Sequence, residues 1–260
     1  MTLLGSRLRQ ASLALACALL FPAGCGQSRT GAAAFSAGKV VVVFLDRSQS
    51  TQADRQQYAK ALAMILSSLK EGDRFVVGAI TEESSRDFVK YIDQVLPPPL
   101  PAETIWDNQL DYKRKSANQK QTIEQLIAEL RQKVDSLLAE PSNATRSAIF
   151  ETLTIADQIF ASEKRKKVLV LLSDMLEESQ QANFARAVID DAFIDQQIQA
   201  QRKAGILPNL RGAHIYVAGA RARTPEHAAA VQHFWEHYFE ATGASLDRGH
   251  YSRVLFVFTE

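Results

Sequence analysis

Three oxygen-bearing side chains stand at alternate positions directly after an apolar run near the start of the chain. The run from Val40 to Leu45 is followed by Asp46, Ser48 and Ser50. If the run is a strand, this period of two points all three side chains the same way at its end. Carboxylate and hydroxyl oxygens are hard ligands that suit Mg²⁺, Mn²⁺ or Ca²⁺ and suit copper or thiolate-bound zinc poorly. The spacing therefore predicts an oxygen-rich cation site.

Two more oxygen-bearing residues follow other predicted elements. Thr145 opens a helical pattern after a short loop, and Asp174 comes just after the apolar run 168–172. Loops at the carboxyl ends of parallel strands converge on one crevice, so we expect these residues beside Asp46. Two aspartates cancel the charge of a divalent ion and hydroxyls add none, so a bound ion would still attract one anionic oxygen. A glutamate or aspartate of a partner is such an oxygen.

The elements that must position these residues alternate along the chain. Strands are expected at 40–45, 167–172, 213–218 and 253–258, which are apolar runs, and also at 75–80 and 88–95. Amphipathic helices are expected at 53–69, 145–161, 183–203 and 225–242. This alternation predicts an α/β fold, with a doubly wound, mostly parallel central sheet and helices on both faces.

The stretch 97–140 interrupts the alternation as a helical insertion. It begins with the proline-rich segment 97–101, and 110–138 is then polar around a thin apolar stripe, which predicts an extra long helix. The stripe consists of Ile123, Leu126, Ile127, Leu130, Val134, Leu137 and Leu138. It has two interpretations: packing on the flank of the domain, which is the commoner outcome, or binding to a partner.

The N-terminus has the pattern of an export signal. Basic residues precede the apolar stretch 11–21, which is too short to be a comfortable membrane-spanning helix, so a signal peptide is expected over 1–25. Its end, Pro22-Ala-Gly-Cys25, is similar to a bacterial lipobox, although Pro22 replaces the usual leucine. The resemblance implies lipidation of Cys25, and Gly26 implies the outer membrane of a Gram-negative cell, facing the periplasm. An ordinary cleaved signal peptide is the alternative.

Composition limits the remaining possibilities. The chain has 260 residues, of which 46% are apolar, enough for one good-sized core. Lys and Arg number 30 against 29 acidic residues, so the net charge of +1 gives no drive toward nucleic acid, and no nucleic-acid partner is expected. Both cysteines, Cys17 and Cys25, lie in the expected signal peptide. We therefore expect a flexible tether over 26–38 and one domain over 39–260, without disulfides.

Taken together, the five site residues resemble a known motif. Asp-x-Ser-x-Ser at 46–50, then Thr145 and Asp174, resemble the metal-ion-dependent adhesion site of von Willebrand factor A (vWA) domains. The resemblance covers about 39–258, with 97–140 as an expansion. It implies a binding module and no enzyme, in which Mg²⁺, or Mn²⁺ or Ca²⁺, takes up a carboxylate of a protein or peptide ligand. It also implies that the three hydroxyls lie at the ion, with Asp46 and Asp174 acting largely through water.

The chain departs from that family pattern in its loops. The family often has glycine near the threonine and after the last aspartate, where this chain has Ser142-Asn-Ala144 and Met175, and Ser173 replaces a common threonine. These departures bear on loop shape and on affinity. The alternative to a metal site is a structural role, in which each of these residues caps a turn or a helix.

Two enzyme motifs are incomplete. His233-Phe-Trp-Glu-His237 fits the inverted zinc-protease pattern H-x-x-E-H, but only 23 residues remain for the distant glutamate ligand. Asp46 resembles the nucleophile of haloacid-dehalogenase-like phosphatases, but Ser48 stands where that mechanism needs a second aspartate. The alternatives to a metal-dependent module are therefore a metal-free scaffold that binds through the 110–138 helix and a metal-dependent hydrolase.

Overall fold

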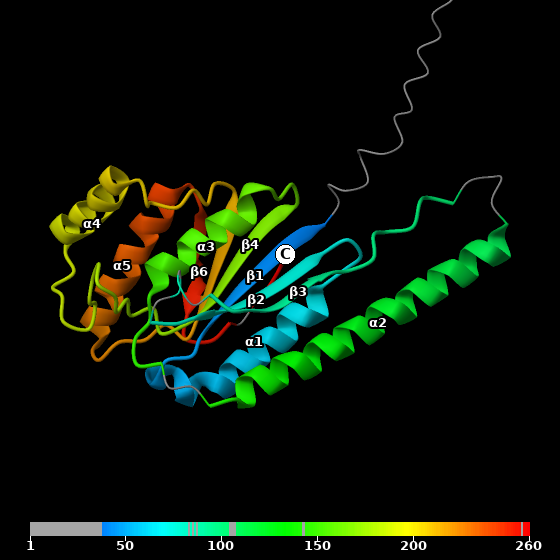
Figure 1. The fold of residues 1–260 in the computed structure, drawn as a ribbon, viewed down its shortest axis with the longest axis horizontal. Helices are drawn as coiled ribbons and strands as arrows, with labels where there is room; N and C mark the ends of the chain where they lie inside the picture. The colour runs from blue at the N-terminus through cyan, green and yellow to red at the C-terminus, as the bar shows by residue number, and fades with distance from the viewer. Residues whose placement is uncertain are drawn as a thin grey trace, which may run out of the picture. The chain divides into compact units, whose positions relative to one another are not determined.

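The centre of the molecule is a six-stranded sheet in the order β3-β2-β1-β4-β5-β6 (Figure 1). The computed structural model describes residues 38–82, 84, 86, 88–103, 108–141, 144–255 and 257–260. β3 is antiparallel to β2, and the other neighbouring strands are parallel. The strands are β1 Lys39–Asp46, β2 Arg74–Ile80, β3 Lys90–Val95, β4 Lys166–Leu172, β5 Ala213–Ala218 and β6 Ser245–Ser252. The predicted doubly wound α/β fold is confirmed.

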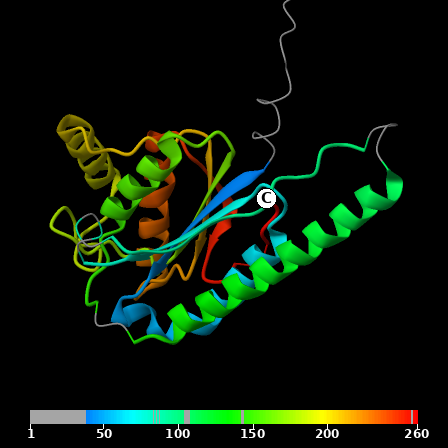
Figure 2. The same cartoon turned by 45° about the vertical axis from the view of Figure 1, so that its right-hand side comes forward.

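Helices cover both faces of this sheet (Figures 1 and 2). α1 and α2 pack on one face, and α3, α4 and α5 pack on the other. The helices are the short 3-10 helix η2 Gln49–Asp54, α1 Arg55–Ser68, α2 Gln109–Ala139, α3 Ile149–Ala161, α4 Asp191–Ala204 and α5 Pro225–Thr242. Among the described residues, no helix is both long and apolar enough to cross a membrane.

The apolar character of β1 follows from its place between two cores. Val40, Val42 and Phe44 belong to the core under α3, α4 and α5, whereas Val41, Val43 and Leu45 belong to the core under α1 and α2. A strand buried on both faces has no polar alternation to show, which is why its sequence is a continuous apolar run. The central position of β1 carries Asp46 to the middle of the carboxyl edge.

The long helix α2 packs on the flank of the domain. Leu130, Val134 and Leu137 are buried in the core that α1 also lines, and the Arg55 side chain donates a hydrogen bond of 3.0 Å to the Leu138 carbonyl. Figures 1 and 2 both show α2 running along α1. Ile123, Ile127 and Leu138 pack against the same core, so most of the apolar stripe is used within the chain, which is the first of its two interpretations.

The prediction of a strand at 253–258 is wrong. The last strand is Ser245–Ser252, whose side chains are mostly exposed or half-buried. A strand at the edge of a sheet is held by backbone pairing with one neighbour, so it needs no apolar run. The apolar residues that follow it pack differently, because Leu255 and Phe258 join the core on the α1 face.

Two predicted helices begin later than expected. α3 begins at Ile149 and α4 at Asp191. The residues before α3 are held away from helical geometry, because the Ala148 N–H donates to the Thr81 carbonyl at 3.0 Å. Asp190 caps α4 by accepting a hydrogen bond from a backbone N–H in its first turn, at 2.8 Å.

The predicted signal peptide, Cys25 and residues 26–37 of the predicted tether lie outside the described residues.

Candidate metal site at the carboxyl edge of the sheet

The predicted site lies where the strand order reverses direction. β1 and β4 are neighbours, with β2 and β3 on one side of the pair and β5 and β6 on the other. The pair is parallel and in register, with Leu45 beside Leu172, so the loops carrying Asp46 and Asp174 leave the sheet together. The crevice at such a switch point is the usual ligand position in doubly wound sheets.

Four of the five predicted residues form one hydrogen-bond network. The Ser48 and Ser50 hydroxyl oxygens lie 2.9 Å apart, and Ser50 Oγ donates to Asp174 Oδ2 at 2.7 Å. Asp46 Oδ1 accepts from the Ser48 backbone N–H at 2.9 Å. The structure therefore brings Asp46, Ser48, Ser50 and Asp174 together, as the spacing predicts.

The fifth residue, Thr145, has a different partner. Its backbone N–H and its hydroxyl both donate to Glu82 Oε1, at 2.7 and 2.6 Å. The loop before α3, which carries Thr145, still contacts the site, because the Gln49 N–H donates to the Ala144 carbonyl at 3.0 Å. These hydrogen bonds from Thr145, with a contribution from Arg146, lower the pKa of Glu82. Glu82 follows the end of β2, a signal that our sequence reasoning did not use.

Two further serines bind Asp46. Ser147 Oγ lies 3.1 and 3.0 Å from its two carboxylate oxygens, and Ser173 Oγ donates to Oδ2 at 2.6 Å. Ser173 is recognisable from the sequence as a hydroxyl beside Asp174. Ser147 is not, because only the folding of the loop against β2 brings it to Asp46.

The two aspartates are buried without a cationic side chain to pair with. Asp46 is 3% exposed and Asp174 2% exposed, and neither forms an ion pair with a described residue. Burial raises the pKa of Asp46. Burial, with the charge of Asp46, raises the pKa of Asp174 to about 6. Arg221 lowers the pKa of Asp174 and so offsets part of this effect without pairing with it, and two buried carboxylates beside serine hydroxyls form a donor set that fits a divalent cation.

The donor atoms of the site indicate which kind of metal ion it would bind. Among the residues that the structure describes, no group of three or more His, Cys, Asp or Glu side chains could hold a metal ion. A site here depends on two carboxylates and several hydroxyls, all of them oxygen donors. Such donors suit Mg²⁺ or Mn²⁺ rather than a thiolate-bound or imidazole-bound metal.

A glycine next to the site leaves no room for a side chain. Gly219 follows β5 with φ +105°, and an added Cβ would lie 2.6 Å from Tyr58 Oη and 2.8 Å from the Ser173 carbonyl oxygen. The Tyr58 hydroxyl is buried and has no hydrogen-bond partner among the described residues. Any side chain at 219 would therefore press on both Tyr58 and the strand end that carries Asp174.

Gly219→Ala is expected to lower the free energy of unfolding by about 2–3 kcal/mol, from backbone strain and overpacking. Gly205→Ala is the matched control, because Gly205 also has a positive φ of +69° but no atom lies within 4 Å of an added Cβ. The control should lose only about 1 kcal/mol. Urea denaturation measures both changes. Equal losses in the two variants would show that the close contacts at Gly219 do not matter.

The residue after Asp174 adopts a conformation that favours glycine. Met175 has φ +65°, the only positive φ of a non-glycine residue among those described. Its side chain is buried, and the Trp235 indole N–H donates to its carbonyl oxygen at 2.9 Å. These contacts explain how methionine holds a backbone shape for which the vWA pattern uses glycine.

A buried glutamate holds the start of α3. Glu177 Oε2 accepts hydrogen bonds from the backbone N–H groups of Ile149 and Phe150, at 2.7 and 3.0 Å. Burial raises the pKa of Glu177 to about 8, despite these bonds. No sequence signal pointed to Glu177, because it lies in an irregular loop and reaches a helix 28 residues away in the chain.

Glu177→Gln should stabilise the protein at alkaline pH. The pKa of Glu177 is higher in the folded chain than its ordinary 4.5, so its stabilising contribution is full below pH 4.5 and is lost as the pH rises to about 8. Glutamine still accepts both N–H bonds but does not ionise. We expect equal stability at about pH 5 and a gain on the order of 4 kcal/mol at about pH 9.

Urea denaturation across this pH range, with Glu178→Gln as the neighbouring control, checks the prediction. A Glu177→Gln curve parallel to that of the wild type at every pH would contradict it.

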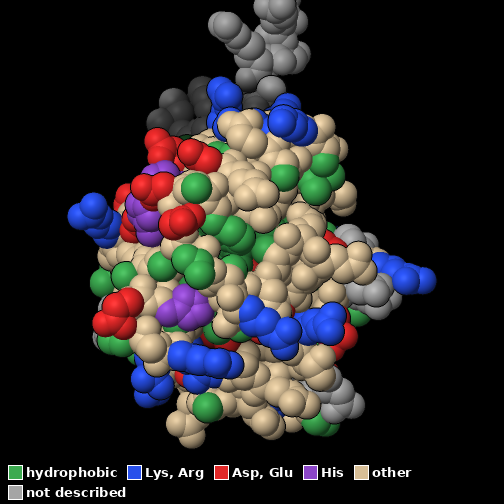
Figure 3. Space-filling model, turned by 90° about the vertical axis from the view of Figure 1, so that its left-hand side faces the viewer, with side chains coloured by type: hydrophobic (Ala, Val, Ile, Leu, Met, Phe, Trp, Pro, Cys, Tyr) green, Lys and Arg blue, Asp and Glu red, His purple; other side chains and the backbone are tan. Residues whose placement is uncertain are grey.

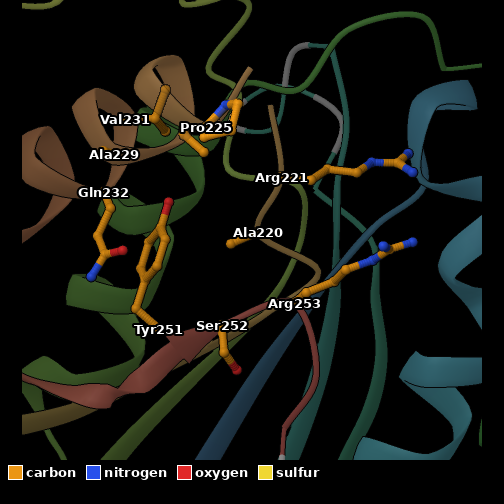
Figure 4. Close-up of a pocket in the computed structure, with 10 residues that line it drawn as sticks. Ala220, Arg221, Pro225, Ala229, Val231, Gln232, Tyr251, Ser252 and Arg253 are labelled. Carbon is orange, nitrogen blue, oxygen red and sulfur yellow. The ribbon is translucent and has the colours of Figure 1, made fainter. Parts of the chain in front are cut away.

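An open hollow of about 390 Å³ adjoins the site between the start of α5 and β6. In Figure 4, Arg221 and Arg253 extend in the same direction, away from Tyr251 and Gln232. Arg221 Nη1 lies 3.2 Å from Asp54 Oδ2, and its backbone N–H donates to the Asp174 carbonyl at 3.3 Å. Arg221 thus links the β5–α5 loop to the end of η2 and to Asp174.

Two of the five residues of the motif at 233–237 belong to the core. Phe234 and Trp235 are fully buried in an aromatic cluster on α5. His233 Nε2 lies 3.0 Å from Asp191 Oδ1, and the His233 and His237 rings are 4.3 Å apart between centroids. Both histidine side chains lie at the exposed flank of α5.

The fold and this site define an α/β domain of the doubly wound class, with an oxygen-rich, doubly acidic site at its switch point. Comparison with models of protein families found no match, and comparison with curated proteins found none either.

Solved structures give more distant similarities. They include a von Willebrand factor type A protein from Catenulispora acidiphila, at 18% identity and TM-score 0.38, over 79% of this chain and 43% of that one. The pilus adhesin SpaC from Lactobacillus rhamnosus GG, in its open conformation, has 11% identity and TM-score 0.42, over 80% and 27%. The type V pili tip protein Mfa5 from Porphyromonas gingivalis has 17% identity and TM-score 0.31, over 72% and 28%. This chain spans less than half the length of each.

Proposed function

We propose that the protein is an interaction module that binds an acidic side chain of a partner protein or peptide through a divalent metal ion. Asp46, Ser48, Ser50, Thr145 and Asp174 would hold the ion, with Mg²⁺ as the first choice. The ion supplies positive charge that a carboxylate oxygen of the partner can bind. The observation that carries this proposal is the pair of buried aspartates, joined by serine hydroxyls at the switch point and forming no ion pair among the described residues.

The hydrogen bonds around Asp46 support this assignment. Ser147, Ser173 and the Ser48 N–H together hold both of its oxygens in place. Preorganised oxygens of this kind suit a small cation, because fewer groups must be ordered when it binds. Thr145 is the residue whose role needs a direct test, since its hydroxyl is held by Glu82.

A peptide array tests the partner chemistry. The array carries glutamate or aspartate at one position, with glutamine and asparagine at the same position as matched controls. We expect the protein to bind the acidic peptides in Mg²⁺, to release them in EDTA, and to leave the amide controls unbound. Equal binding with and without Mg²⁺ would instead favour the metal-free scaffold.

We further propose that the protein acts outside the cytoplasm, anchored by a lipid on Cys25 to the outer membrane and facing the periplasm. The support is the lipobox-like sequence before Cys25 and the polar stretch that follows it. Palmitate labelling of the wild type should be lost in Cys25→Ala. Label that persists in the variant would contradict the anchor.

We do not propose catalysis. All five histidines lie in described segments, and their hydrogen-bond or ion-pair partners lie outside the five-residue site. A hydrolase would need a general acid or base in addition to the carboxylates that hold the ion, and no histidine is placed there. Mg²⁺-stimulated turnover of a phosphoester panel, lost in Asp46→Ala, would overturn this proposal in favour of a metal-dependent hydrolase.

A further inference from the structure

Three arginines line a second hollow beside Thr145. The hollow is about 390 Å³ and is bordered by Arg146, Arg186 and Arg223 together with Glu178 and Asn183. The arginines come from three different loops: the one before α3, the one after β4 and the one between β5 and α5. Residues far apart in the sequence are therefore brought to one polar depression at the same edge of the sheet as the metal site.

The three guanidinium groups are available to a ligand. All three side chains are exposed, and none lies within ion-pair distance of a carboxylate of a described residue, although Arg146 is near enough to Glu82 to lower its pKa. Three arginines against one glutamate make the hollow locally basic on a chain whose net charge is only +1. Figure 3 shows Lys and Arg side chains gathered across the lower half of the face that lies on the left of Figure 1.

The loops that line the hollow are connected to the loops that form the metal site. Arg146 follows Thr145 directly, so their Cα atoms lie about 3.8 Å apart. The Glu178 N–H donates to the Ser147 carbonyl at 2.9 Å, which ties the loop bearing Arg186 to the loop bearing Thr145. An extended peptide spaces alternate side chains by about 7 Å, so neighbouring acidic residues of one ligand can reach both places.

We propose that this arginine hollow is a second anion subsite, which binds additional carboxylates of an acidic segment whose first carboxylate is taken by the metal site. The proposal rests on the proposed function, and it makes the partner an acidic cluster rather than a single acidic residue. Guanidinium groups fit carboxylates because their planar N–H forks bind both oxygens. The metal site would fix the position of the ligand, and the hollow would select for charge next to it.

Binding of two fluorescent peptides tests the subsite. One peptide carries a single glutamate and the other carries four consecutive glutamates, in otherwise identical neutral sequences. In Mg²⁺ the wild-type protein should bind the four-glutamate peptide about tenfold more tightly, because each exposed ion pair changes affinity by about twofold to fivefold. Arg146→Gln, Arg186→Gln and Arg223→Gln combined should remove that preference and leave binding of the single-glutamate peptide unchanged.

A matched control changes the same charge elsewhere. Lys113, Arg114 and Lys115 are exposed on α2, and their combined change to glutamine should keep the tenfold preference. Unchanged urea midpoints in both triple variants confirm that they fold. A preference that survives the loss of the three hollow arginines, or that falls equally in the α2 control, would overturn the subsite.

The same experiment separates this inference from the proposed function. If the single-glutamate peptide does not need Mg²⁺, the metal-dependent function fails. The subsite is then decided by the four-glutamate peptide in EDTA, whose salt-sensitive binding should be lost with the three hollow arginines and kept in the α2 control. If Mg²⁺-dependent binding of the single-glutamate peptide is intact and the preference is insensitive to the arginines, the function stands and the subsite fails.

Discussion

Asp46→Asn is expected to abolish the stabilisation that Mg²⁺ gives to the folded protein. Asp46 is the centre of the site, with hydrogen bonds from Ser48, Ser147 and Ser173. The amide keeps the shape but removes one of the two buried negative charges on which binding of the ion depends. At a hundredfold excess of Mg²⁺ over its dissociation constant, the wild type should gain about 2.7 kcal/mol, and the variant should gain none.

Thermal unfolding with and without Mg²⁺ measures this difference. The variant also supplies an internal check, because burial raises the pKa of Asp46 and its charge therefore opposes folding at neutral pH. Without metal, Asp46→Asn should be at least as stable as the wild type. A variant that is less stable without metal, or that still gains from Mg²⁺, would refute the assignment of Asp46.

Trp235→Ala should have the largest effect on stability, a loss of about 3–5 kcal/mol. Trp235 is fully buried among aromatic rings of α3, α5 and the loop after β4, including Phe150 and Phe184. Its indole N–H also holds the Met175 carbonyl, so the loop after Asp174 loses support. We therefore expect weaker Mg²⁺ binding along with the lower stability.

Trp235→Phe separates packing from hydrogen bonding. It keeps one six-membered aromatic ring and removes the pyrrole ring with its N–H, so it should lose about 1–3 kcal/mol, less than Trp235→Ala. Val188→Ala is the surface control, because Val188 is 82% exposed and its change should stay within about 0.5 kcal/mol. Urea denaturation of the three variants gives the comparison. A loss in Trp235→Ala no larger than that of the control would contradict the packing.

The strands of the sheet centre could be predicted because they are buried on both faces. β1 and β4 are apolar along nearly their whole length, and α5 begins and ends at the predicted residues. β6 could not be predicted in this way, since an edge strand of mostly exposed residues has no apolar signature. The order of the strands depends on long-range pairing, which no local pattern encodes.

The site residues also differ in whether the sequence alone could predict them. Asp46, Ser48, Ser50 and Asp174 are set by strand ends and by a period of two, both of which are visible in the sequence. Ser147 and the Glu82–Thr145 contact depend on how one loop lies against the end of β2, through the bond from Ala148 to Thr81. The arginine hollow depends on three loops meeting at once, so composition and spacing alone did not reveal it.

Calorimetric titration of Mg²⁺ and Mn²⁺ into the purified protein tests the central claim most directly, with Asp46→Ala and Thr145→Ala beside it. We predict saturable binding at one site by the wild type, no binding by Asp46→Ala, and weakened or absent binding by Thr145→Ala. A folded wild type that binds neither ion would contradict the account and make this edge of the sheet a metal-free scaffold.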